Sequence, residues 1–349
     1  MLESTLNEEI TPSSDVAQSA TERYTCGGLF AGIGGFCVGF ENAGFETSWC
    51  VDLSEDAEAT YRQNFPHVRY LRRDIAKCAS TDLSPVDVLH AGFPCQSFSA
   101  AGYRQGFEDE RGKLFFNIPR LLAEWGSERP KVIVLENSPF IKVGEGGAWF
   151  KEIQTRIRRS GYWFSDRNCF ELDTHQHGGL PQRRKRLFMI AVRSDFYDFN
   201  GIDLSDITPK QIVKMSEIIE SEQVTESYYL PEDNRYNTMI GKQVRRNDPN
   251  QLYQLRKYVV RLPESGMCPT LTANMGQGGH NVPFIFNADR LRKLTEFECL
   301  KLQGFPPSFE FPTDLTLARR YTLVGNAVSP AISTLIATRI NNFLRSETP

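Results

Sequence analysis

Val86 to Gly102 read VDVLHAGFPCQSFSAAG, and the other predictions start from this stretch. Val86–His90 is a short, mainly apolar run with β-branched residues, which predicts a buried strand. A Gly-Phe-Pro turn ends the strand, Pro94 stiffens the loop, and Cys95 follows at once. Open α/β sheets bind their ligands at the carboxyl ends of parallel strands. An isolated cysteine most often packs as a small hydrophobe, so partners elsewhere in the chain must decide whether Cys95 is reactive.

Composition limits the class of protein. The 349 residues are 40% hydrophobic and 24% charged, as in a soluble globular protein with a large and a smaller domain. No apolar run approaches the roughly 18 residues that span a bilayer, and the N-terminus lacks a signal peptide. We therefore expect a cytoplasmic protein with no membrane partner. The eight cysteines are irregularly spaced without a CxxC pair, which favours reduced thiols over a disulfide framework or a metal site.

The charge pattern leaves nucleic-acid binding open. The formal net charge is −3, which carries no global basic signature. Basic residues are nevertheless clustered at 156–159, 183–186, 245–246 and 256–257. Each cluster alone is typical of a solvated helix face, but a local basic cleft can bind phosphates in an acidic protein.

A glycine-rich turn lies between the first expected strand, 24–30, and a helix at 35–43 that ends before Gly44. A second strand, about 46–51, leads to Asp52, 20 residues after Gly32. This spacing is typical of an acidic residue that binds the ribose hydroxyls of a nucleotide-like cofactor. Cys37 interrupts a GxGxxG pattern, which argues against a dinucleotide with its pyrophosphate on the helix.

In the rest of the chain the expected strands and helices alternate, as in an α/β fold. Strand 131–135 ends in Glu136, 41 residues after Cys95, so both side chains should face one cleft. Thr295 and Glu298 form a capping box at the start of another helix. Further elements are expected as helices at 56–65, 114–125, 150–160 and 328–345 and as strands at 68–71, 162–171 and 187–192. From 196 to 290 the alternation of strands and helices becomes irregular, which indicates a separate small domain.

Six blocks in order over residues 29–330 resemble the motifs of DNA (cytosine-5)-methyltransferases of the compact prokaryotic modification type. They include FAGIGGF at 30–36, GFPCQSFS at 92–99, ENS at 136–138, QRRKRLF at 182–188 and VGNAV at 324–328. The resemblance implies an α/β fold: a Rossmann-like S-adenosylmethionine-dependent methyltransferase domain with a smaller, irregular β-rich target-recognition domain. The expected segments are a mobile polar tail (1–23), a catalytic and cofactor-binding domain (24–195), a recognition domain (196–290), a hinge (291–319) and a C-terminal segment (320–349) that returns to the large domain.

The resemblance also assigns roles. Cys95 is the nucleophile, Glu136 meets N3 of the cytosine, and Arg184 and Arg186 contact its ring oxygen or nearby phosphates. Ser138 stands where the family usually has Val, which puts the local packing in question. The expected cofactor-binding residues are Phe30, Gly32, Gly34, Gly35, Asp52, Leu53, Asp74, Ile75, Pro94, Asn326 and Ala327. The expected DNA-binding residues are Gln96, Ser99, Arg111, Thr270 and Leu271.

The implied cofactor is S-adenosylmethionine, with S-adenosylhomocysteine as product, and the implied partner is double-stranded DNA. We expect a nucleoid-associated monomer, no metal, and a cognate restriction endonuclease that acts on the same site. Three alternatives stay open. A tRNA cytosine-5 methyltransferase uses the same motifs, a non-catalytic homologue would bind DNA without methylating it, and a nicotinamide-dependent oxidoreductase would need the missing phosphate loop.

Overall fold

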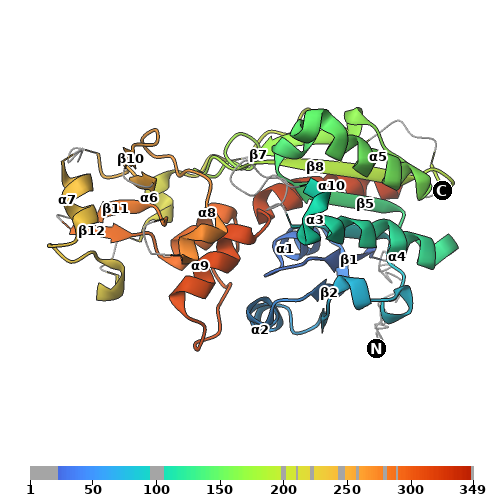
Figure 1. Ribbon diagram of the computed structural model, residues 1–349, viewed down its shortest axis with the longest axis horizontal. Coiled ribbons are helices and arrows are strands. Elements are labelled where there is room, and N and C mark those ends of the chain that lie inside the picture. Colours follow the sequence, from blue (N-terminus) through green and yellow to red (C-terminus); the bar gives the residue numbers. More distant parts are fainter. Residues whose placement is uncertain are drawn as a thin grey trace, which may run out of the picture.

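The computed structural model describes residues 23–94, 106–197, 202–209, 211–220, 224–242, 248–256, 259–277, 281–287 and 290–346. Residues 1–22 of the predicted tail lie outside this part of the chain, as do Cys95, Gln96 and Ser99. Figure 1 shows two lobes, a large one built on a central sheet and a small one at the opposite end of the molecule.

The large lobe contains, in the described residues, an eight-stranded sheet in the order β3-β2-β1-β4-β5-β8-β6, with β7 also pairing with β8. Strands β3 to β5 in this order run parallel, and β8 is antiparallel to β5. This confirms the predicted Rossmann-like α/β fold. The strands are β1 (Thr25–Leu29), β2 (Glu46–Asp52), β3 (Arg69–Arg72), β4 (Val88–Ala91), β5 (Val132–Asn137), β6 (Tyr162–Trp163), β7 (Cys169–Asp173) and β8 (Lys185–Arg193).

Helices cover both faces of this sheet (Figure 1). Alternate residues of β5 explain why: Ile133 packs in the core with α4 and α5, whereas Val132 and Val134 pack in the core with α1 and α10. A strand buried on both faces reads as a continuous apolar run. The helices of the large lobe are α1 (Gly35–Asn42), α2 (Glu55–Asn64), α3 (Glu110–Lys113), α4 (Asn117–Trp125), α5 (Ala148–Arg159) and α10 (Pro330–Ser346).

Two predicted elements are divided in the structure. The strand expected at 162–171 is split into β6 and β7, because Asn168 accepts hydrogen bonds from Ser165 and closes a turn between them. The block at 321–328, expected to open the C-terminal helix, lies mostly in a separate helix, α9 (Leu317–Asn326). Extended backbone at 327–329 separates α9 from α10, which begins at Pro330.

One stretch, Leu317–Ser346, has the length and composition of a membrane-crossing helix, with a mean hydropathy of 1.2 over its most apolar window. In the structure this stretch is α9 followed by α10, and 61% of the window is buried inside the protein. Ser333 of α10 donates a hydrogen bond to the carbonyl of Gly35, so the C-terminal helix packs directly on α1.

The small lobe is irregular and held by its own apolar cluster, which includes Ile240, Tyr253 and Phe284. Its elements are α6 (Met215–Ile218), α7 (Arg235–Gly241), β9 (Gln254–Arg256), β10 (Val259–Arg261), β11 (Phe284–Asn287) and β12 (Arg290–Lys293). The strands form two antiparallel pairs, β9 with β10 and β11 with β12. Four described residues near its start pack differently, because they join the core beneath α10 of the large lobe: Tyr197, Ile202, Leu204 and Ile207.

A shared core joins the lobes. It contains Phe65 and Val68 of the large lobe together with Leu252 and Ile285 of the small lobe. Helices α8 (Glu296–Gln303) and α9 lie between them (Figure 1). The predicted capping box at the start of α8 is present: Thr295 Oγ1 accepts from Glu298 N at 3.0 Å and Glu298 Oε2 accepts from Thr295 N at 2.7 Å.

Candidate active site

The glycine-rich turn after β1 has the backbone of a ligand-binding loop. Phe30, Gly32 and Gly34 have φ angles of 57°, 54° and 89°. Such angles suit glycine but are costly for phenylalanine, and strained non-glycine residues of this kind gather at functional sites. A Cβ on Gly35 would lie 2.0 Å from the carbonyl oxygen of Val328, whereas a Cβ on Gly32 would meet nothing within 4 Å. One side of the turn is therefore packed against the C-terminal segment, and the side at Gly32 is open.

Asp52, at the end of β2, holds this turn in place. Its Oδ2 accepts a hydrogen bond from Gly32 N at 2.9 Å, and its Oδ1 accepts one from Ser54 N at 2.9 Å. The next residue, Leu53, is an apolar side chain that is 67% exposed. An open glycine turn, a fixed carboxylate and an exposed apolar side chain fit a ligand with a ribose diol and a flat base.

Two more of the expected cofactor residues, Asp74 and Ile75, follow β3, the neighbour of β2 in the sheet. Asp74 caps the short helix Ile75–Lys77 by accepting from Ala76 N at 3.0 Å, and the Ile75 side chain is buried in the core beneath α4. At the C-terminal end of α9, Asn326 is exposed and Ala327 is buried.

Two of the expected catalytic residues, Glu136 and Arg186, meet at the carboxyl end of β5, beside the end of β4. These strands are parallel neighbours, with Ala91 paired to Leu135, so the turn before Cys95 and the residue after Leu135 meet at one edge of the sheet. A Cβ on Gly92 would lie 3.7 Å from Glu136 Oε2 and 3.4 Å from Val328 Cγ2. The described chain reaches Pro94, one residue before the expected nucleophile.

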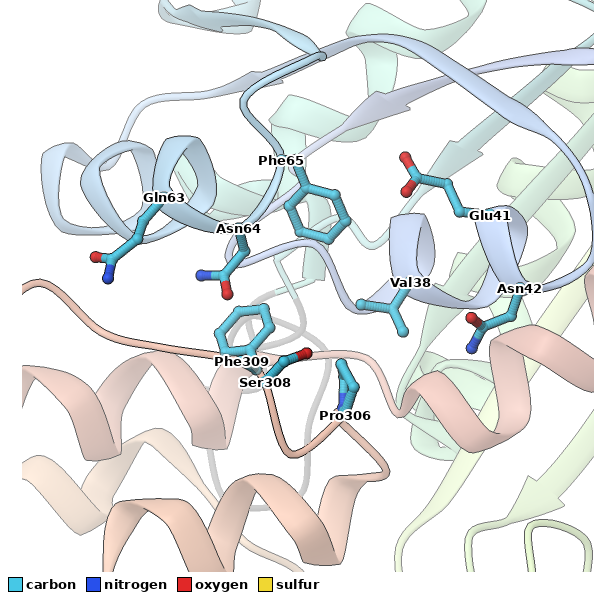
Figure 2. A pocket seen from close by; sticks show the side chains of 9 residues that line it. All are labelled: Val38, Glu41, Asn42, Gln63, Asn64, Phe65, Pro306, Ser308 and Phe309. Carbon is cyan, nitrogen blue, oxygen red and sulfur yellow. The ribbon is translucent and has the colours of Figure 1, made fainter.

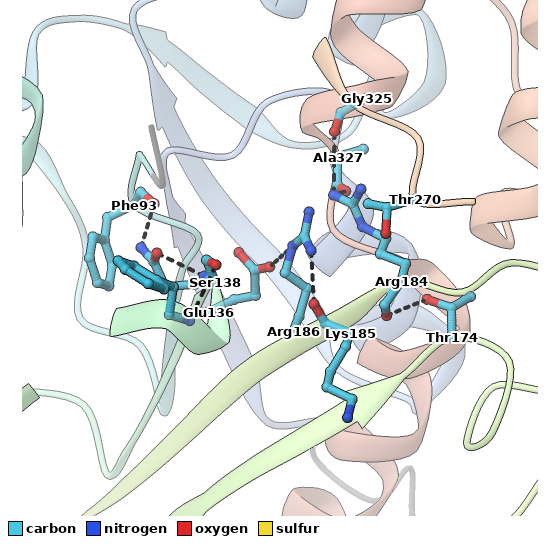
Figure 3. A network of polar contacts seen from close by, with 12 residues as sticks. Phe93, Glu136, Ser138, Thr174, Arg184, Lys185, Arg186, Thr270, Gly325 and Ala327 are labelled. Atoms are coloured by element: carbon cyan, nitrogen blue, oxygen red, sulfur yellow. Dashed lines mark hydrogen bonds and ion pairs between the residues drawn. The ribbon is translucent and has the colours of Figure 1, made fainter. Parts of the chain in front are cut away.

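Glu136 forms an ion pair with Arg186, whose Nε lies 3.2 Å from Glu136 Oε1 (Figure 3). The Glu136 side chain is only 7% exposed. Burial raises the pKa of its carboxyl above the ordinary value, although the positive charges of Arg186 and Arg184 oppose that shift. A carboxyl that keeps its proton more readily than usual is suited to donate a proton or a hydrogen bond to a substrate.

Arg184 lies away from this pair, although the sequence places it in the same motif. Its side chain is 3% exposed and donates to backbone carbonyls: Nη1 to Leu271 at 2.7 Å, and Nη2 to Ala327 at 2.8 Å and Gly325 at 3.3 Å. Figure 3 shows the two guanidinium groups pointing to different targets. The described contacts of Arg184 are those of a residue that joins chain segments.

Sequence reasoning gave no role to Asn137, which the structure places at the centre of the site. Its side chain is buried, and Nδ2 donates to the carbonyl of Phe93 at 3.1 Å while Oδ1 accepts from Ser138 N at 2.8 Å. Asn137 therefore ties the turn that leads to Cys95 to the strand that carries Glu136. The signal available in the sequence was its place directly after Glu136.

Ser138, where the family usually has Val, has a local function in this fold. Its hydroxyl accepts a hydrogen bond from Phe140 N at 3.4 Å and caps the short helix Pro139–Lys142. A valine has no oxygen to make this cap.

The described DNA-binding candidates are engaged with the protein itself. Arg111 pairs with Asp109 through Nη2 and Oδ2 at 2.7 Å, with its side chain partly exposed. Thr270 Oγ1 donates to the carbonyl of Arg183 at 2.6 Å. Leu271 is buried in the core that joins the lobes, so its side chain faces the protein interior.

A separate cavity of about 280 Å³ lies between α1, α2 and the chain around Phe309 (Figure 2). None of the predicted site residues lines it. Two of its amide groups have protein partners: Asn64 Nδ2 donates to the carbonyl of Glu310 at 2.8 Å, and Gln63 Nε2 donates to the Glu310 carboxylate at 2.9 Å. The cavity is therefore distinct from the site at the strand ends.

Comparison with known proteins points to one family. The family described as C-5 cytosine-specific DNA methylase matches residues 24–342. The Type II methyltransferase M.Bsp6I of Bacillus sp. (strain RFL6) is 36% identical over 314 residues, covering 89% of this chain and 96% of that protein. The Type II methyltransferase M.HaeII of Haemophilus aegyptius is 32% identical over 320 residues, covering 90% and 92%. The structure of the S. pombe Dnmt2 methyltransferase has the same fold, with a TM-score of 0.70 and 20% identity over 94% of this chain and 100% of that chain.

Proposed function

This chain belongs to the C-5 cytosine-specific DNA methylases of the Type II kind, and we propose that it methylates a cytosine flipped out of one short duplex sequence. The observation that carries the proposal is the Glu136–Arg186 ion pair, which lies beside the turn that leads to Cys95. The methyl donor in this proposal is S-adenosylmethionine.

The residues that would hold the cofactor surround the open side of the glycine turn. Asp52 would accept hydrogen bonds from the ribose hydroxyls, and Leu53 would pack on the adenine. Asn326 lies at the end of α9, which is next to the turn because Val328 contacts Gly35. When bound, S-adenosylmethionine supplies a methyl group on a positively charged sulfur, which is the electrophile that the reaction needs.

The chain itself must make cytosine C5 nucleophilic. The Cys95 thiolate adds to C6, and the electron pair displaced from the C5–C6 double bond is delocalised through the ring as N3 takes a proton from Glu136. C5 would then take the methyl group as the methyl–sulfur bond breaks, which leaves S-adenosylhomocysteine. A base removes the C5 proton, the C5–C6 double bond re-forms as the C6–S bond breaks, and Cys95 is released as a thiolate. The proton on N3 returns to Glu136, which restores the carboxyl.

Two side chains near Glu136 fit this scheme. Arg186 would hold the cytosine O2, where negative charge develops as the thiolate adds. Its ion pair with Glu136 also fixes the carboxyl at the end of β5. Asn137 would keep the Cys95 turn at this end of the sheet through its bond to the Phe93 carbonyl.

The cytosine must leave the duplex to reach these groups, because its C6 face is covered inside the base stack. We infer that the small lobe reads the flanking base pairs through the major groove, where each pair presents a distinct pattern of donors and acceptors. Gln96, Ser99 and Arg111 are the expected contacts near the flipped base. We also propose a cytoplasmic monomer with a restriction endonuclease of the same specificity as its partner.

The proposal is tested by incubating the protein with S-adenosylmethionine and mixed-sequence duplex DNA, and then mapping 5-methylcytosine at base resolution. Methylation confined to one short motif is expected. If tRNA were methylated and duplex DNA were not, the substrate would be reassigned to RNA. If neither were methylated while the cofactor bound, a non-catalytic DNA-binding role would replace the proposal.

The nucleophile is tested with Cys95→Ser. Turnover should fall below detection, because a serine hydroxyl is far less nucleophilic than a thiolate at neutral pH. Cofactor affinity, measured by calorimetry, should change by less than about twofold. Cys169→Ser is the matched control, since Cys169 lies on β7 outside the expected site, and it should retain activity. Residual turnover near the wild-type rate in Cys95→Ser would exclude Cys95 as the nucleophile.

A further inference from the structure

Arg184 joins two segments that are far apart in the sequence. On one side it donates to the carbonyl of Leu271, in the small-lobe chain between β10 and β11. On the other it donates to the carbonyls of Gly325 and Ala327, at the end of α9. All of these contacts are buried, so one guanidinium links the two segments inside the protein. Figure 3 shows its contacts on the side of Gly325 and Ala327.

The α9 end touches both halves of the proposed active site. The carbonyl oxygen of Val328 fills the position that a side chain on Gly35 would need, and its Cγ2 packs beside Gly92. The segment 325–328 therefore lies against the cofactor turn and against the turn before Cys95. A shift of this segment would therefore change the packing of both the cofactor turn and the turn before Cys95.

The Leu271 end belongs to the small lobe's link to the large one. Leu271 N donates to Gln182 Oε1 at 3.2 Å, and Thr270 Oγ1 donates to the carbonyl of Arg183. Gln182 in turn donates to the carbonyl of Leu302 in α8 at 2.8 Å. The small-lobe chain is thus held on the residues that immediately precede β8.

A guanidinium is suited to this position, because its planar fork aims several donors in fixed directions, whereas an ammonium is a compact point charge. A lysine at 184 would keep the positive charge near Glu136 but could not span the Leu271 and Ala327 carbonyls in the same geometry. The substitution Arg184→Lys therefore separates charge from positioning.

We propose that Arg184 is a positioning residue that couples DNA binding by the small lobe to cofactor binding at the glycine turn. This inference rests on the proposed function, because it takes the small lobe as the DNA reader and the turn as the cofactor site. By linkage, a bound cofactor should tighten DNA binding by the same factor by which DNA tightens cofactor binding.

The test measures how tightly the protein binds a duplex that contains the motif found in the methylation map. The affinity is measured by fluorescence anisotropy with and without saturating S-adenosylhomocysteine. In the wild-type protein the product should tighten DNA binding by about tenfold, within the usual range of coupling between sites. In Arg184→Lys the product should tighten DNA binding by less than about threefold. The affinity of this variant for S-adenosylhomocysteine without DNA should stay within about threefold of the wild-type affinity. The reciprocal experiment, product binding with and without DNA, should give the same factors.

Arg193→Lys is the matched control. Arg193 is a buried arginine at the other end of β8 that also donates to backbone carbonyls, those of Ser127 and Arg129, both at 2.9 Å. It should lose thermal stability and keep the full coupling factor. If Arg184→Lys does not fold, Gln182→Met removes the acceptor for Leu271 N and should reduce the coupling in the same direction.

The coupling role would be overturned if the product did not tighten DNA binding in the wild-type protein, or if it tightened DNA binding in Arg184→Lys as much as in the wild type. Either result would leave the methyltransferase assignment intact. If the wild-type protein methylated no DNA, the proposed function and this inference would both fall. The methylation map and the binding factors are independent measurements, so these outcomes are distinguished.

Discussion

At the scale of single residues, burial of Glu136 favours the protonated form of its carboxyl. Its carboxyl is buried with only Arg186 as an ion-pair partner in the described contacts, and burial raises its pKa. The ionised carboxylate is therefore less favourable in the folded protein than in the unfolded chain. Burial of Glu136 therefore lowers the stability of the folded protein, and it also favours the protonated carboxyl that can give a proton to the substrate.

The sign of the pH effect follows from this raised pKa. The folded protein binds the Glu136 proton more tightly than the unfolded chain, so stability decreases as pH rises from the ordinary value of 4.5 through the raised pKa. Glu136→Gln removes this penalty. We expect a melting temperature roughly 1 to 3 °C above wild type at pH 7, with the difference shrinking toward pH 4.5.

The same substitution should lower the rate of methyl transfer at least about 100-fold, because the amide is a far weaker acid. Glu152→Gln is the matched control, since Glu152 pairs with Arg156 on the exposed side of α5, and it should alter neither property. Calorimetric melting and a methyl-transfer assay at several pH values check both. A melting temperature for Glu136→Gln below wild type at pH 7 would mean that the Arg186 pair stabilises the ionised form more than burial destabilises it.

At the scale of secondary-structure elements, the contact between α1 and the C-terminal segment shapes the cofactor turn. Gly35 begins α1, and the Val328 carbonyl occupies the space that any larger residue would need. Ser333 Oγ donates to the Gly35 carbonyl at 2.8 Å and keeps the two helices together. The glycine is required here by close approach of two backbones, since Gly35 has an ordinary helical conformation.

Gly35→Ala should therefore destabilise the protein by about 2 to 3 kcal/mol, because a backbone segment must move to admit the methyl group. Cofactor affinity should fall as well, since the displaced segment borders the turn. Gly241→Ala is the control: Gly241 ends α7, and a Cβ there meets nothing within 4 Å. Chemical denaturation and calorimetric binding measure both effects. An unchanged stability in Gly35→Ala would show that the C-terminal segment yields without cost.

At the scale of the whole molecule, the two lobes share one apolar core, and the structure predicts that they unfold together. Tyr61 of α2 and Phe65, the residue that follows this helix, pack in the same cluster as Met215 and Met275 of the small-lobe chain. All four tryptophans, at positions 49, 125, 149 and 163, lie in the large lobe. Tryptophan fluorescence therefore reports the large lobe alone, whereas calorimetry reports the entire chain.

We expect a single calorimetric transition whose midpoint coincides with the fluorescence midpoint, because loss of the shared core would expose both lobes at once. Leu271→Ala, within the shared core, should shift both midpoints together. Tyr253→Ala, in the separate cluster of the small lobe, is the comparison, and it should broaden or split the calorimetric peak. A second wild-type transition without a fluorescence change would mean that the small lobe unfolds independently.

The sequence by itself determined the order of the strands and helices and the residues at the strand ends. Alternating and continuous apolar runs, glycine turns and the Thr295–Glu298 capping box are local signals, and they predicted β4, β5, α1 and α8 within a few residues. Because parallel strands place their carboxyl ends at one edge, the approach of the Cys95 turn to Glu136 also followed from the sequence. The family motifs supplied the chemistry of these residues.

Only the tertiary structure decided where individual side chains of a motif go. Arg184 and Arg186 are two residues apart and belong to the same motif, yet one joins backbone carbonyls and the other pairs with Glu136. The partners of Arg184 lie 87 and 143 residues away in the sequence, and that of Arg186 lies 50 residues away (186 − 136), so no local pattern encodes these contacts. For the same reason the role of Asn137, the buried side chain of Leu271 and the packing of Tyr197 and Ile202 under α10 became visible only in the folded molecule.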